Sequence, residues 1–162
     1  MKTVYALFRT YDQAEAAVQE LLHQGFDLQD MNVIVQDSVA RARTGSKAAV
    51  SRPGQMPPGL DRMLSGEQGI NAPDTGSIYA AGQRAKILAH AAASPGSPGL
   101  RHQLMEFGIG TETAQAYLDG IKGGGLLFWM VADDDHAHDA GEIVEEHHGA
   151  HVLMNPAPRR RR

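Results

Sequence analysis

The two ends of this chain read as halves of one small α/β domain, and a long stretch rich in Gly and Pro separates them. Residues 1–36 follow a strand–helix–strand pattern, and residues 100–154 follow a pattern of helices, strand, helix and strand. Both ends must pack together to bury their apolar faces. The sequence therefore predicts one split domain built from residues 1–36 and 100–154, with residues 37–99 as an insertion and residues 155–162 as a basic tail.

The first half carries clear boundary signals. Residues Thr3–Phe8 are rich in β-formers, and Asp12 with Glu15 has the spacing of a capping box for the helix that follows. Gly25 stands where a left-handed helix C-cap is expected. The next run of β-formers predicts a second strand over Met31–Gln36.

The second half repeats this logic with an extra pair of helices. Gly108 and Gly123–Gly125 are expected to end those two helices. The apolar run Leu126–Ala132 predicts a strand, and the acidic residues Asp133–Asp135 supply N-cap candidates for the next helix. A short final strand is expected over Ala150–Met154.

Strands and helices in the order βαβ…βαβ predict a ferredoxin-like α+β sandwich, with a four-stranded, mainly antiparallel sheet and a long insertion between its second and third strands. The two strands expected at the centre are apolar on both sides, whereas an uncovered sheet face would alternate with polar residues. The open face therefore needs a cover. The candidates are the middle segment or a second subunit. The middle segment has a helical patch near residues 77–93, with apolar residues at Ile78, Ala81, Ala85, Leu88 and Ala92.

The open sheet face is the predicted interaction surface, because aromatic and aliphatic anchors dominate the energetics of interfaces. We expect its anchors to be Tyr5, Leu7, Leu127, Trp129 and Val131. A register shift of one residue would place Val4, Phe8, Phe128 and Met130 there instead.

The composition of the chain excludes several kinds of site and argues against a membrane protein. The chain has 162 residues and no cysteine, which excludes disulfides, thiolate nucleophiles and thiolate metal sites. The start of the chain has no signal-peptide pattern, so we expect a cytoplasmic protein. The longest apolar run, Leu126–Ala132, is far shorter than the roughly 20 residues that span a bilayer. No membrane segment is expected.

Charge is divided unevenly along the chain. The two predicted halves together carry a net charge of −11, while the middle segment carries +3 and the tail +4. Arg159–Arg162 are able to contact phosphate, and Tyr5 with Phe128 or Trp129 faintly resembles the aromatic pattern of RNA-recognition domains. The acidity of the predicted folded part argues against a nucleic-acid partner. Binding of single-stranded RNA is kept as the least favoured alternative.

Five histidines are candidate metal ligands. His136 and His138 lie at the start of the helix expected after Asp133–Asp135, and His147, His148 and His151 lie near its far end. A helix of about 12 residues rises roughly 18 Å, so the two groups cannot share one ion within a subunit. A solvated acidic helix face is the favoured interpretation, and a metal ion that bridges two subunits is the alternative.

No motif indicates catalysis or a cofactor. Gly108-Ile109-Gly110 and Gly123-Gly124-Gly125 are not placed in the strand–loop–helix arrangement that cradles phosphate, and turns explain them. No nucleophile elbow selects any Ser, His or Asp. We therefore expect no enzymatic activity and no cofactor.

Two segments resemble a known family. The opening TVYALFRTYDQAEAAVQELLHQGFDLQDMNVIV resembles the start of bacterial heat-induced or general stress protein (YflT-like) domains, and GIGTETAQAYLDGIKGGGLLFWMVA resembles a later segment of the same family. The matching positions are Gly108, Ile109, Ala114, Tyr117, Gly124 and Leu126, followed by His148, Gly149 and Ala150. This resemblance implies a stress-related bacterial protein without an assigned catalytic activity.

The sequence thus predicts a non-catalytic, stress-associated protein that acts by self-association or by binding a protein partner that the sequence does not name. Self-association would use the open sheet face or the 77–93 segment. The alternative is a regulatory module that binds a small ligand or a metal.

Overall fold

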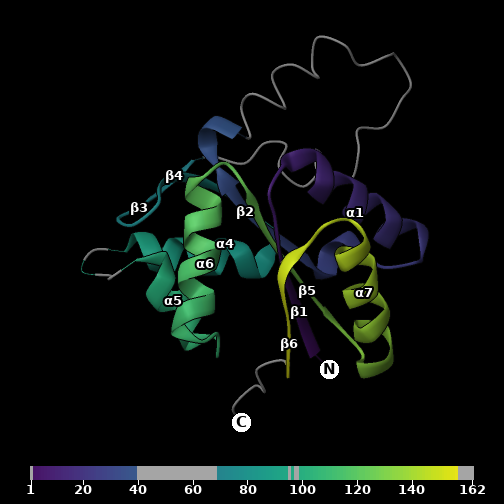
Figure 1. Ribbon diagram of the computed structural model, residues 1–162. Coiled ribbons are helices and arrows are strands. Elements are labelled where there is room, and N and C mark those ends of the chain that lie inside the picture. The colour runs from purple at the N-terminus through teal and green to yellow at the C-terminus, as the bar shows by residue number, and fades with distance from the viewer. Residues whose placement is uncertain (1, 40–68, 95, 97–98, 157–162) are drawn as a thin grey trace.

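The computed structural model describes residues 2–39, 69–94, 96 and 99–156. One sheet runs through this part of the chain, with helices on both of its faces (Figure 1). The strands are β1 (Lys2–Phe8), β2 (Met31–Gln36), β3 (Ile70–Ala72), β4 (Gly76–Ala81), β5 (Leu126–Ala132) and β6 (Ala150–Pro156). The helices are α1 (Tyr11–His23), the 3-10 helix η1 (Leu28–Asp30), α4 (Gln83–Ala93), α5 (Leu100–Glu106), α6 (Thr111–Lys122) and α7 (Asp134–Glu146).

The strands lie in the order β3-β4-β2-β5-β1-β6, and every neighbouring pair is antiparallel. β1 lies between β5 and β6, so the first and last strands of the chain are neighbours in the sheet. Tyr5 on β1 lies opposite Trp129 on β5, and Trp129 lies opposite Asn32 on β2. These three residues form a row across the sheet.

The predicted four-stranded ferredoxin-like sheet is wrong, because the sheet has six strands. The four predicted strands occupy the adjacent positions β2-β5-β1-β6, and the hairpin of β3 and β4 adds two strands beyond β2. Part of the predicted helical patch near 77–93 is strand β4. Gly82, with φ 97°, separates that strand from helix α4, because few residues with a side chain adopt this conformation.

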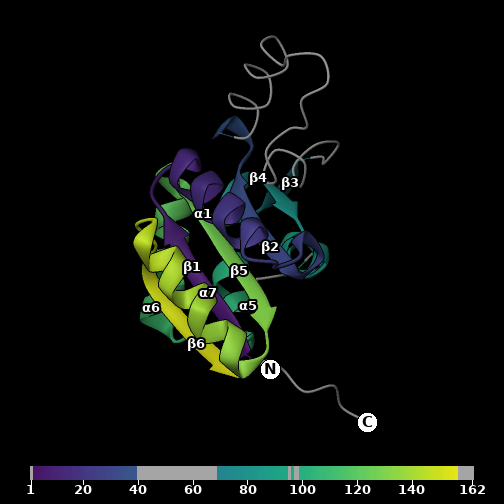
Figure 2. The same ribbon diagram turned by 90° about the vertical axis from the view of Figure 1, so that its right-hand side faces the viewer.

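One face of the sheet is covered by α1 and α7, which lie side by side over it in the turned view (Figure 2). The N-cap of α1 is Thr10 rather than the predicted Asp12: the Thr10 side chain accepts a hydrogen bond from the backbone N–H of Gln13 at 3.2 Å. Past the end of the helix, Gly25 has φ 99°, as its predicted role as a left-handed cap requires. The backbone N–H of Phe26 then bonds back to Leu21.

The opposite face, which the sequence left open, is covered by α4, α5 and α6 of the same chain (Figure 1). Tyr5, Leu7, Leu127 and Trp129 are buried there. They pack in one apolar cluster with α4 and α6, which contribute Ala85, Leu88, Ala89, Ala92, Ala114, Tyr117, Leu118 and Ile121. Of the two predicted covers, the middle segment is the one observed, and α5 and α6 complete it.

No helix among the described ranges combines the length and the apolar character that a bilayer crossing needs. The predictions made for residues 40–68 and for the arginines 159–162 fall outside the described residues.

Candidate ligand-binding groove

The residues predicted to form an interaction surface are buried within one copy of the chain. Tyr5, Leu7, Leu127 and Trp129 lie beneath α4 and α6, and Val131 is also buried at the end of β5. The alternative set of Val4, Phe8, Phe128 and Met130 lies on the other face, beneath α1 and α7. Neither set lies on the described surface, because the helices of the same chain cover both faces of the sheet.

The five candidate histidines are not brought together. His136 and His138 lie in the first turns of α7, where they contact Asp133 at 3.3 Å and Glu142 at 3.1 Å. His147, His148 and His151 lie at the far end of α7 and in β6. In the described ranges, no group of three or more His, Cys, Asp or Glu side chains is arranged to hold a metal ion.

A groove runs along the end of the sheet where β2 begins and β5 ends. It consists of two hollows that share Asp30 and Val131. The amide hollow has a volume of about 200 Å³ and is lined by Gln29, Asp30, Asn32, Gln83, Arg84 and Val131. The acidic hollow has a volume of about 250 Å³ and is lined by Gln24, Gly25, Phe26, Asp27, Asp30, Val131, Ala132, Asp133 and His136. We call the two together the end groove.

Asn32 is the buried polar residue of the amide hollow, with only 2% of its surface exposed. Its Oδ1 accepts hydrogen bonds from the backbone N–H groups of Arg84 at 3.0 Å and Ala85 at 3.1 Å. These groups lie in the first turn of α4, where the N-cap residue Gly82 has no side chain to bond them. A Cβ on Gly82 would lie 2.4 Å from the carbonyl oxygen of Met31, so glycine lets β2 approach closely enough for Asn32 to cap the helix.

These two hydrogen bonds fix the orientation of the Asn32 amide. A backbone N–H can be accepted only by the amide oxygen, so the Nδ2 group must point away from α4. Among the residues that the structure describes, none accepts a hydrogen bond from Nδ2. The amide hollow is thus lined by a residue that is buried as a whole but whose Nδ2 donor is open to solvent.

Arg84 brings a positive charge to the same hollow. Its side chain is exposed, and it forms no ion pair with a residue of the described ranges. The guanidinium is also close enough to Tyr5 to act on its hydroxyl. Burial raises the pKa of Tyr5 to about 12, and the charge of Arg84 acts in the opposite direction.

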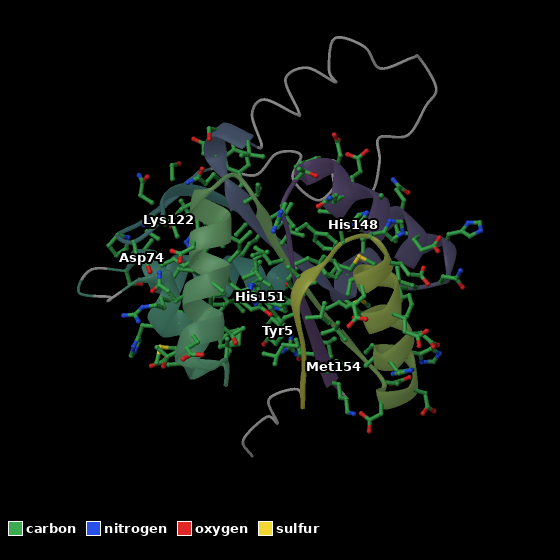
Figure 3. The ribbon with its side chains drawn as sticks, viewed as in Figure 1. Tyr5, Asp74, Lys122, His148, His151 and Met154 are labelled. Carbon is green, nitrogen blue, oxygen red and sulfur yellow. The ribbon has the colours of Figure 1, made fainter. Side chains whose placement is uncertain are left out.

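The aromatic row beside the amide hollow is closely packed. Tyr5 lies between the sheet and α6 (Figure 3), with its ring centre 6.5 Å from that of Tyr117 and 6.1 Å from that of Trp129. The Tyr117 hydroxyl donates to the backbone carbonyl of His151. Burial is the main cause that raises the pKa of Tyr117, and the neighbouring Tyr5 adds to it. Trp129 is thus packed against Tyr5, one strand away from Asn32.

The acidic hollow has a different chemistry. Asp27 caps η1 by accepting a hydrogen bond from the Gln29 N–H at 3.0 Å. Asp133 is paired with His136, whose ring stands edge-on to Phe26 with 6.2 Å between ring centres. The shared residue Asp30 is exposed at the junction of the two hollows. The end groove is therefore positive at Arg84 in the first turn of α4 and negative at the start of α7.

This groove was not predicted from the sequence. One signal was present: Asn32 is a polar residue inside the otherwise apolar run Met31–Val35, and a buried polar side chain needs partners. Its partner Arg84 lies 52 residues further along the chain, so the pairing could not be read from local pattern.

The groove is lined by groups that bind ligands non-covalently. It offers an amide donor, a guanidinium and carboxylates around the small apolar side chain of Val131. Comparisons of the chain with protein-family models, with curated proteins and with solved structures found no match.

Proposed function

We propose that this chain is a non-catalytic module that binds a small polar ligand in the end groove. The observation that carries the proposal is the unused Nδ2 donor of Asn32, a residue that is almost fully buried and lines the amide hollow. Nδ2 is not one of the buried atoms that lack a partner among the described residues, so it is open to solvent. A ligand oxygen in the amide hollow would accept a hydrogen bond from Nδ2 in place of water, and Arg84 would add a charge-assisted hydrogen bond.

The resemblance to bacterial general stress proteins is compatible with this role. A non-catalytic protein with a ligand groove is able to act as a regulatory module whose state depends on the concentration of a small molecule. Stress association and a cytoplasmic location stay predictions from the sequence.

Self-association has less support than ligand binding. Its predicted anchors, such as Tyr5 and Trp129, are buried against helices of the same chain. The large apolar side chains that are exposed among the described residues are Ile87, Met105 and Met154, at 61%, 36% and 41%. They lie on three different elements, α4, α5 and β6. Scattered exposed apolar side chains are normal for a monomer and do not mark an interface.

RNA binding also has less support. Stacking on bases requires exposed aromatic faces, whereas Tyr5, Phe128 and Trp129 are all buried. Phe128 also lies on the opposite face of the sheet from the other two.

Fluorescence of Trp129 provides a test, because this is the single tryptophan of the chain and it lies opposite Asn32. We would titrate the protein with small anions, amines, zwitterions and neutral polyols and record the emission. At least one class is expected to give a saturable change that Arg84→Gln weakens by about tenfold, the equivalent of one charged hydrogen bond.

The matched control is Arg101→Gln, since Arg101 is an exposed arginine on α5 and does not line the groove. This variant should bind like the original protein. If no class of small molecule gives a saturable response, the proposal is wrong.

A further inference from the structure

We infer that the ligand of the end groove is a small zwitterion of the amino-acid type, with a carboxylate held by Arg84 and Asn32 and an ammonium group held by Asp30. This inference rests on the proposed function and names the chemistry of its ligand. It follows from the division of the groove into a donor-rich hollow and an acidic hollow that meet at Asp30.

The amide hollow favours a carboxylate. A guanidinium is planar and offers parallel N–H donors whose spacing matches the two oxygens of a carboxylate. The Asn32 Nδ2 group adds a neutral donor whose direction is fixed by the two bonds from the first turn of α4. Both groups are without a partner among the described residues, so a carboxylate would not displace an existing interaction of either.

The charge around the groove disfavours an anion of higher charge. Asp30 lines the amide hollow itself, and Asp27 and Asp133 line the adjoining acidic hollow. Each carboxylate repels a second anion, and the repulsion grows with the charge of the ligand. A phosphate dianion would therefore be attracted by one arginine and repelled by three carboxylates. A ligand carboxylate carries a single charge, so the same three carboxylates repel it less.

The junction of the hollows favours an ammonium group. Asp30 is the acidic residue that lines both hollows, and it forms no ion pair with the described part of the chain. An ammonium one carbon away from a carboxylate in the amide hollow would reach this junction. Val131 lines both hollows as well and offers an apolar contact for the carbon skeleton.

The size of the groove agrees with a ligand of this kind. Drug-sized ligands occupy pockets of roughly 300–1,000 Å³. The hollows measure about 200 and 250 Å³, so together they fall in the lower half of this range. The groove therefore has room for an amino acid.

The test is a calorimetric titration of the full chain with each of the common L-amino acids. For the tightest binder, the N-acetyl derivative removes the ammonium charge and the carboxamide removes the carboxylate. We expect each derivative to bind at least about tenfold more weakly than the parent, because each loses one charged contact. Inorganic phosphate is expected not to bind.

Two variants assign the contacts to residues. Asp30→Asn should lower the affinity for the amino acid by about tenfold. Its affinity for the N-acetyl derivative should be unchanged, since that derivative has no ammonium. Arg84→Gln should lower the affinity for the amino acid and leave the affinity for the carboxamide unchanged. Both side chains are exposed, so the fold should tolerate the changes. Arg101→Gln is again the matched control.

Asn32→Asp adds an independent readout. The aspartate keeps an oxygen to cap α4 but replaces the Nδ2 donor with a second acceptor. It should abolish binding of the amino acid while the thermal unfolding midpoint shows whether the protein is still folded.

The outcomes separate the two proposals. If a simple carboxylate or an amine binds in an Arg84-dependent or Asp30-dependent way as tightly as any amino acid, the zwitterion inference is overturned and the proposed function stands. If amino acids bind but Asp30→Asn and Arg84→Gln have no effect, the inference is likewise overturned. If amino acids, carboxylates, amines, phosphate and neutral polyols all fail to bind, both are overturned.

Discussion

At the scale of single residues, this fold depends on polar side chains that cap helices far away in the sequence. Asn32 caps α4, and Asp74, in the turn between β3 and β4, caps α5 (Figure 3). The Asp74 carboxylate accepts from the N–H groups of Leu100 at 2.8 Å and Arg101 at 3.0 Å. Both N-cap residues, Gly82 and Gly99, are glycines with positive φ. The caps therefore come from the sheet side and tie the covering helices to it.

Replacement of Asp74 with alanine should lower the free energy of unfolding by about 1–2 kcal/mol, because two N–H groups at the start of α5 lose their acceptor. The measurement is the midpoint of urea unfolding. Asp74→Asn, which keeps one oxygen acceptor, should give an intermediate value. An alanine variant with the midpoint of the original protein would contradict this role of Asp74.

The buried tyrosines give the protein a dependence on high pH. An unfolded tyrosine loses its proton near pH 10, whereas burial raises the pKa of Tyr5 to about 12 in the folded chain. Between these values the folded state binds more protons than the unfolded state, so stability should fall as the pH rises from about 10 to about 12. Tyr117, whose pKa is also raised by burial, acts in the same direction.

Urea unfolding at a series of pH values checks this dependence. The variant Tyr5→Phe has no proton to lose at this position and should show a shallower decline between pH 10 and pH 12. An equally steep decline in this variant would show that Tyr5 does not contribute.

At the scale of elements, the contact between α6 and the sheet is unusually close at one point. A Cβ added to Gly120 would lie 2.4 Å from Cδ2, 2.7 Å from Cδ1 and 2.9 Å from Cγ of Leu7 on β1. Leu7 is itself buried, so it has little room to move. The absence of a side chain at Gly120 thus sets the distance between this helix and β1.

Replacement of Gly120 with alanine tests this contact. A helical Gly→Ala change gains up to about 1 kcal/mol in helix propensity, but overpacking of a core costs about 1–3 kcal/mol. The cost of overpacking should exceed the gain in helix propensity, so the unfolding midpoint should fall. In the control Gly123→Ala, the new Cβ would lie 3.4 Å from its nearest neighbour, and no such loss is expected. Equal effects in the two variants would refute a special role for Gly120.

Strands with strong local patterns could be predicted from the sequence, and elements defined by distant pairing could not. β2 and β5 have the predicted bounds, because runs of apolar β-formers end there at polar or glycine residues. β4 was predicted as helix because Ile78, Ala81 and Ala85 recur at helical spacing. The segment forms a strand because it pairs with β2 and β3. Such pairing depends on tertiary structure rather than on local preference.

The need for a cover over the second face could also be inferred from the sequence, but the position of the groove could not. The apolar character of β1 and β5 on both sides is a local property. The end groove requires Asn32, Arg84 and Val131 to meet, and they come from three distant segments. Only the order of the strands and the start of α4 bring them together.

At the scale of the whole molecule, one chain covers both faces of its own sheet. The two apolar clusters lie on opposite sides of the sheet, under α1 and α7 on one side and under α4, α5 and α6 on the other (Figures 1 and 2). The middle segment thereby supplies the cover that a second subunit would otherwise provide. The end groove exists for the same reason, since α4 forms part of its wall.

Acrylamide quenching of Trp129 fluorescence tests this self-contained fold most directly, because the tryptophan is single and only 1% exposed beneath that cover. The measurement is made on the folded protein over a series of dilutions, with urea-unfolded protein as the reference for full access. We predict quenching far below the reference and independent of protein concentration. Quenching that rises on dilution toward the unfolded value would show that a second copy supplies the cover, and would contradict this account.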